Sequence, residues 1–236
     1  MKERLNKIIL KESDNFNSWI ELINNYLEIK FREDNIQENE IWNRTQGCVD
    51  AFSKITELCI EYGRFKDKWD YNNFYINLYG PELIIKSLKT NCEYKIGIDN
   101  KGIYLTTDIR YSENIRYMGD DFWKLLLSFY KFEGFVYDEY EFVSKDKMKQ
   151  FPELFSTNKS MVFRILRKYF FDSIETENNY VSSSVGELKI QFTINIDFEE
   201  IISNFCLAFK AMYQLNYSLW KITDLRNKNN GRQQKI

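Results

Sequence analysis

The sequence contains no histidine. This absence excludes Ser-His-Asp and Cys-His nucleophile systems, zinc bound by histidine, and histidine acid–base chemistry. A glycine-rich phosphate loop, a Gly-x-Ser-x-Gly motif and a Cys-x-x-Cys pair are missing as well. An enzyme built from this chain would have to use carboxylates, Lys, Tyr, Cys or a metal bound by carboxylates. The leading interpretation therefore includes no cofactor and no metal.

Proline and glycine are scarce, with 2 and 9 residues among 236, so long disordered linkers are not expected. The four cysteines are Cys48, Cys59, Cys92 and Cys206. Cys48 and Cys59 fall in one predicted helix, where their separation corresponds to about 16 Å, too far for a disulfide. We expect four reduced thiols in a cytoplasmic protein.

Long apolar runs are absent too. The first ten residues mix Lys, Glu and Arg with Leu and Ile, so they do not form a signal peptide. No apolar stretch is long enough to span a membrane. The 33 basic and 35 acidic residues leave a net charge of −2, which gives no overall field for nucleic acid or an anionic membrane. We expect neither as a partner.

Two amphipathic helices are predicted in the first third of the chain, over residues 14–33 and 38–68. In the first, apolar side chains recur at steps of three and four residues, and Ser13 or Asp14 can cap its start. In the second, the apolar stripe runs from Ile41 at near-heptad spacing.

These two helices are expected to form a helical hairpin within residues 1–68. The default interpretation packs its apolar stripes onto the protein's own core. The alternative is that helices 14–33 and 38–68 carry a homo-oligomer or another coiled-coil partner.

Alternating apolar and polar residues predict an antiparallel sheet farther along the chain. Residues 94–109 alternate on both sides of an Asp99-Asn100-Lys101-Gly102 turn, which predicts a β-hairpin. Residues 188–196 alternate cleanly, which is typical of a strand with one polar face. Residues 181–185 could pair with this strand across Gly186, and Gly80-Pro81 is interpreted as a turn.

The final helix is predicted to begin after Asp197, with Glu200 completing a capping box. The polar, basic tail over residues 226–236 is expected to be disordered. We therefore predict an α+β fold in which helices at both termini pack on a small antiparallel sheet. Residues 1–225 would form one globular domain, divided into a helical subregion (1–68) and an α+β subregion (69–225).

One pattern resembles the core of metal-dependent nucleases. Glu187 and Lys189 form a Glu-x-Lys on a predicted strand, and Asp172 lies upstream. In that family an Asp and a Glu bind magnesium and a Lys assists the attacking water, so the resemblance implies a catalytic site at these three residues. A second Glu-x-Lys at residues 93–95 and the balanced charge favour the alternative, a solvated strand face.

A second candidate site is the aromatic and acidic segment that begins at Phe135. Its residues Tyr137, Asp138, Glu139 and Tyr140 could dock onto a basic partner, because rings anchor interfaces and carboxylates steer them. The alternative is a loop that covers the core with half-buried rings.

The leading expectation is a non-enzymatic cytoplasmic protein that binds another protein, with a neutraliser of the immunity or antitoxin type acting on a basic toxin as the specific hypothesis. The alternatives are the magnesium nuclease and a structural subunit of a larger complex. The assignment to a binding protein is by analogy, because fold and charge do not fix function.

Overall fold

The computed structural model describes residues 2–30, 36–77, 80–138, 162, 165–166, 184–193 and 196–233. The described chain forms two compact units, each assembled from several stretches of sequence. The first unit comprises Met1–Lys89, Glu93–Leu105 and Gln191–Lys210, and the second comprises Thr90–Cys92, Thr106–Ile190 and Ala211–Ile236. Within the described chain, no helix has the length and apolar character needed to cross a membrane.

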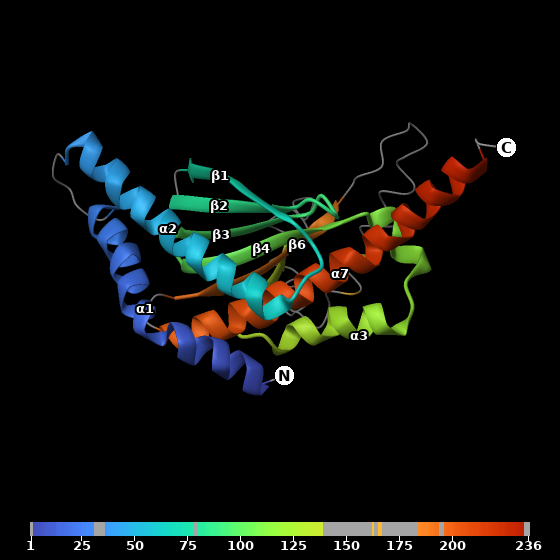
Figure 1. Ribbon diagram of the computed structural model, residues 1–236, viewed down its shortest axis with the longest axis horizontal. Coiled ribbons are helices and arrows are strands. Elements are labelled where there is room, and N and C mark those ends of the chain that lie inside the picture. The colour runs from blue at the N-terminus through green and yellow to red at the C-terminus, as the bar shows by residue number, and fades with distance from the viewer. Residues whose placement is uncertain are drawn as a thin grey trace, which may run out of the picture. The chain divides into compact units, whose positions relative to one another are not determined.

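The fold is α+β, as predicted: the N-terminal helix pair and the long C-terminal helix pack on an antiparallel sheet (Figure 1). The helices are α1 (Lys2–Lys30), α2 (Glu38–Gly63), α3 (Asp120–Ser128) and α7 (Phe198–Gln233), with 3-10 turns at Ser112–Tyr117 and Phe129–Lys131. The strands are β1 (Trp69–Asn77), β2 (Gly80–Ser87), β3 (Glu93–Asp99), β4 (Gly102–Arg110), β5 (Phe135–Asp138) and β6 (Ser184–Phe192). The six described strands lie in the order β1-β2-β3-β4-β6-β5.

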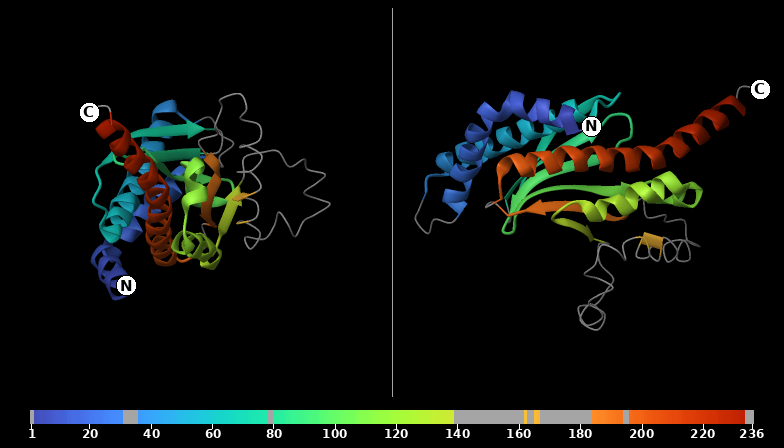
Figure 2. Two further views of the ribbon diagram at one scale, coloured as in Figure 1. Left: turned by 90° about the vertical axis from the view of Figure 1, so that its right-hand side faces the viewer. Right: turned by 90° about the horizontal axis from the view of Figure 1, so that it is seen from below.

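Helices α1 and α2 form the expected antiparallel hairpin and lie side by side in both views of Figure 2. Two side-chain contacts to backbone carbonyls fix its two ends: Arg4 donates to the Glu61 carbonyl at 2.6 Å, and Arg44 donates to the Asn25 carbonyl at 3.1 Å. The predicted starting point of the first helix is wrong. Helix α1 already begins at Lys2, and the Ser13 hydroxyl bonds the Leu10 carbonyl inside the helix instead of capping it.

Helix α2 ends at Gly63, five residues before the predicted end. The reason is that Arg64 adopts the left-handed conformation (φ 50°), and its N–H closes the helix on the Ile60 carbonyl. Most of the predicted apolar stripe of α2 is buried, including Phe52, Ile55 and Cys59, but Ile41 at its start is exposed.

The core of the first unit lies between this helix pair, the first part of α7 and one face of the sheet. Phe209 of α7 contacts Trp69 and Tyr94 of the sheet, with ring centroids 5.4 and 4.8 Å apart. Phe205 and Phe209 are fully buried, whereas Trp220 in the second unit is only half-buried.

In the second unit, α7 is joined to β4 by buried polar contacts. The side-chain oxygen of Asn216 accepts the Arg110 N–H at 3.1 Å, and its amide nitrogen donates to the Asp108 carbonyl at 2.8 Å. The predicted disordered tail is wrong over residues 226–233, because α7 continues to Gln233.

Two predictions about turns also need correction. Gly186 lies within β6, which begins at Ser184, so it is not a turn between two strands. Gly80 and Pro81 begin β2 and pair with β1, so the residues interpreted as a turn belong to the sheet.

Candidate protein-binding surface

The segment expected to form a recognition loop begins as strand β5. Because side chains alternate along a strand, Phe135 and Tyr137 point into the core while Val136 and Asp138 point out. Tyr137 is 2% exposed, and its hydroxyl donates to the Val185 carbonyl at 2.5 Å. Its ring therefore cannot anchor a partner in this conformation. Asp138 is exposed, whereas Glu139 and Tyr140 lie outside the described residues.

The nuclease-like residues lie on β6 and are half-buried on one face of the sheet. Asp138 faces Glu187 across the β5–β6 ladder, and Val136 faces Lys189. The Thr106 hydroxyl donates to Glu187. Asp172 lies outside the described residues. Two carboxylates thus meet across the ladder, but no group of three or more Asp, Glu or Cys side chains in the described part of the chain is placed to hold a metal ion.

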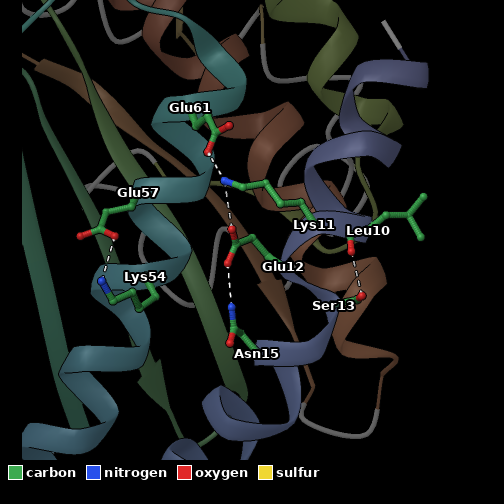
Figure 3. Close-up of polar contacts among 8 residues, drawn as sticks. All are labelled: Leu10, Lys11, Glu12, Ser13, Asn15, Lys54, Glu57 and Glu61. Atoms are coloured by element: carbon green, nitrogen blue, oxygen red, sulfur yellow. Dashed lines mark hydrogen bonds and ion pairs between the residues drawn. The ribbon is translucent and has the colours of Figure 1, made fainter.

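A polar hollow of about 410 Å³ lies between α1 and α2 and belongs wholly to the first unit. Figure 3 shows its charged side chains: Lys11 of α1 reaches both Glu12 (3.3 Å) and Glu61 of α2 (3.9 Å). On α2, Lys54 pairs with Glu57 at 3.1 Å. The hollow thus contains two lysines and three carboxylates, each within ion-pair distance of an opposite charge.

The electrostatics of this hollow are already balanced by its own side chains. The pKa of Glu12 is lowered, first by the hydrogen bond that Asn15 donates at 2.9 Å and also by Lys11, while desolvation opposes the shift. These ion pairs are open to solvent, where such pairs contribute little to stability. The hollow therefore resembles a solvated helix–helix groove more than a charged docking site.

A second hollow in the first unit is apolar and small, with a volume of about 100 Å³. It is lined mainly by isoleucines, among them Ile20, Ile23 and Ile103. Ligand pockets for small molecules usually span about 300–1,000 Å³ and combine apolar walls with a few polar groups. Neither hollow has both the size and the lining of such a pocket.

The most distinctive surface of the first unit is apolar and exposed. We call it the Trp42 patch, and it consists of Ile41 and Trp42 of α2 with Phe74 and Ile76 of β1. Trp42 is 52% exposed, Ile41 42% and Ile76 51%. The ring centroids of Trp42 and Phe74 lie 6.0 Å apart, so the indole lies against Phe74 of strand β1.

Polar side chains border the patch along α2. Glu38 and Glu40 occupy the first turn of this helix. Arg44, one turn farther on, pairs with Glu40 at 2.7 Å and with Glu28 of α1 at 3.3 Å. An apolar centre with a charged border is the usual composition of a protein–protein interface.

Two adjacent apolar residues in α2 are a sequence signal for this patch. Ile41 and Trp42 are adjacent, and two adjacent side chains on a helix differ in direction by about 100°, so a narrow stripe cannot bury both. In the structure both remain exposed: Ile41 continues the row of Thr45 and Cys48, but it lies near the start of α2, before the part of that row that is buried.

Comparisons of the chain with protein-family models, with curated proteins and with solved structures find no match. The case for a function therefore rests on the surfaces described above. Among these, the Trp42 patch combines exposed apolar area, an aromatic anchor and a charged border.

Proposed function

We propose that this chain acts by binding another protein and that the Trp42 patch is its contact surface. The observation that supports this proposal is a half-exposed tryptophan lying against Phe74, with an exposed isoleucine next to it in α2 (Ile41) and another two residues after Phe74 in β1 (Ile76). Contiguous exposed apolar patches on folded proteins commonly mark interaction sites. Tryptophan is also among the residues that most often dominate binding energy.

The physical basis is burial of apolar surface. A large aromatic side chain buries roughly 150–250 Å² when fully covered, and each Å² of apolar area contributes about 25 cal/mol before the costs of association. Glu38, in the first turn of α2, would favour a basic surface on the partner, whereas Glu40 is already paired with Arg44. This border is consistent with the neutraliser hypothesis, in which the partner is a basic toxin, and with assembly into a larger complex.

The test is affinity capture from the native host with three forms of the chain: the parent, Trp42→Ala and Tyr130→Ala. Tyr130 is a matched control, because it is 51% exposed and lies on a different element. We expect a partner that the parent and Tyr130→Ala recover equally and that Trp42→Ala loses by about tenfold or more.

The identity of the recovered partner separates the two versions of the proposal. A single basic protein would favour the neutraliser, and several proteins of one assembly would favour the structural subunit. A partner recovered equally by all three forms would contradict the assignment of the Trp42 patch.

A further inference from the structure

Strand β1 is the outermost strand at one end of the described sheet, where its only strand neighbour is β2 (Figure 1). From Tyr71 to Asn77 it reads Tyr-Asn-Asn-Phe-Tyr-Ile-Asn, without a charge, a proline or a glycine. Edge strands are usually protected from pairing by Lys, Pro or inward-pointing charges. The register shift between Asp70 and Asn73 interrupts the first part of β1, but the regularly paired part, residues 73–77, carries no charge, so among the described residues it forms an edge open to pairing.

The register with β2 shows which backbone groups face the open edge. Ile76 is paired with Pro81, which has no N–H to give to the ladder. The Ile76–Pro81 pair is therefore a non-hydrogen-bonded pair of the antiparallel ladder. The N–H and C=O of Ile76 consequently point away from β2. The same holds two residues earlier for Phe74, whose partner is Leu83.

We propose that β1 pairs in antiparallel orientation with β1 of a second copy of this chain, about a two-fold axis at Tyr75. The inference goes beyond the proposed function: a second copy paired in this way would cover the Trp42 patch, so within the dimer the patch would not be open to a different protein. In this register Phe74 of each copy exchanges hydrogen bonds with Ile76 of the other, and the two Tyr75 residues face each other on the axis. The two sheets thereby become one continuous sheet.

Three features favour a second copy over a different protein. The two residues with outward backbone groups are also the two apolar β1 residues of the patch, so the contact is self-complementary, as a two-fold interface requires. Asn73 would face Asn77, so no like charges oppose each other. Finally, the Trp42 side chains of both copies would flank the new Phe74–Ile76 pairs and lose their exposure to water.

The pairing can be tested by a cross-link at residue 75. All four natural cysteines are fully buried, so Tyr75→Cys would introduce an exposed thiol at a position that is 56% exposed. Oxidised glutathione would take two electrons and two protons from the paired thiols, forming one intermolecular disulfide and two molecules of reduced glutathione. We expect Tyr75→Cys to cross-link at least about tenfold faster than Tyr130→Cys, because pairing raises the local thiol concentration.

Charge variants test the register without covalent chemistry. Tyr75→Lys and Tyr75→Glu each place like charges on the axis, so each alone should sediment as a monomer at micromolar concentrations where the parent is a dimer. An equal mixture of the two should restore the dimer, because Lys then faces Glu. Melting curves close to that of the parent would show that the variants are folded.

A parent chain that stays monomeric throughout the micromolar range, with Tyr75→Cys cross-linking no faster than Tyr130→Cys, would overturn the pairing. If Tyr75→Lys and Tyr75→Glu each sediment as a dimer like the parent, this register is wrong. If the parent is monomeric but a host partner still depends on Trp42, only the second-copy inference fails. If the dimer forms as described and no host partner depends on Trp42, binding to a different protein fails instead.

Discussion

At the scale of single residues, the cysteines show how burial controls chemistry. All four are free and buried, which confirms the expectation of reduced thiols. Burial raises the pKa of the Cys48 thiol, and burial together with a hydrogen bond to Cys206 raises that of Cys59. A thiol that stays protonated is a poor nucleophile, so these side chains should act as small apolar groups in the core.

This burial predicts how stability depends on pH. An unfolded cysteine ionises around pH 8.5, whereas Cys48 and Cys59 remain protonated in the folded chain. Their contribution to the unfolding free energy is complete below about pH 8.5 and is lost as pH rises toward the folded pKa, by up to about 1.4 kcal/mol per pH unit for each thiol.

Denaturant unfolding between pH 7 and about pH 10 measures this slope. Cys59→Ala should unfold with a smaller pH slope than the parent over the range above about pH 8.5. Added reductant should leave the melting temperature of both proteins unchanged. Equal slopes for parent and variant would show that Cys59 ionises normally in the folded chain.

At the scale of elements, the sequence correctly predicted the β3–β4 hairpin and the start of α7. In both, the turn or cap residues and the spacing of apolar residues indicate the same structure. In the β3–β4 hairpin, the Asp99 carboxylate accepts the N–H groups of Lys101 and Gly102. At the start of α7, the Asp197 carboxylate accepts the Glu199 N–H at 3.1 Å, which confirms the predicted cap. Each signal lies within a few residues of the element it defines.

Strands β1 and β2 were not predicted because long-range pairing overrides their local signals. The β1–β2 register shifts between Asp70 and Asn73, which breaks the alternation that identifies a strand. Gly80-Pro81 carries a turn signature, yet Gly80 has φ +149° and lies against the Ile98 carbonyl, where a Cβ would be 2.3 Å from that oxygen. The glycine therefore permits a close approach between strands, which only the folded register shows.

The β5–β6 pair supports a prediction about metal. Glu187 faces Asp138 but accepts a hydrogen bond from the Thr106 hydroxyl, and no group of three or more potential metal ligands occurs among the described residues. We expect millimolar magnesium to leave the melting temperature unchanged, because an ion that does not bind the folded chain cannot stabilise it. A magnesium-dependent rise that disappears in Glu187→Ala would revive the nuclease interpretation.

At the scale of the whole molecule, the Trp42 patch depends on a contact between residues 32 positions apart in sequence, Trp42 and Phe74. Local periodicity assigned Ile41 to the core, and the mix of rings and carboxylates assigned Tyr137 to a recognition surface, but the structure exposes Ile41 and buries Tyr137. The order of the strands determines which parts of the helices the sheet covers. This cover in turn determines which apolar side chains stay exposed. The surface first predicted for binding therefore lies on a segment whose described rings, Phe135 and Tyr137, are buried.

The most direct measurement is a titration of the captured partner against the parent, Trp42→Ala and Asp138→Lys. Asp138 is the exposed, described residue of the surface first predicted. We expect Trp42→Ala to weaken binding by about 1–4 kcal/mol, mainly through faster dissociation, and Asp138→Lys to change the affinity by less than about threefold. If Asp138→Lys weakens binding strongly while Trp42→Ala binds like the parent, the Trp42 patch is not the contact surface.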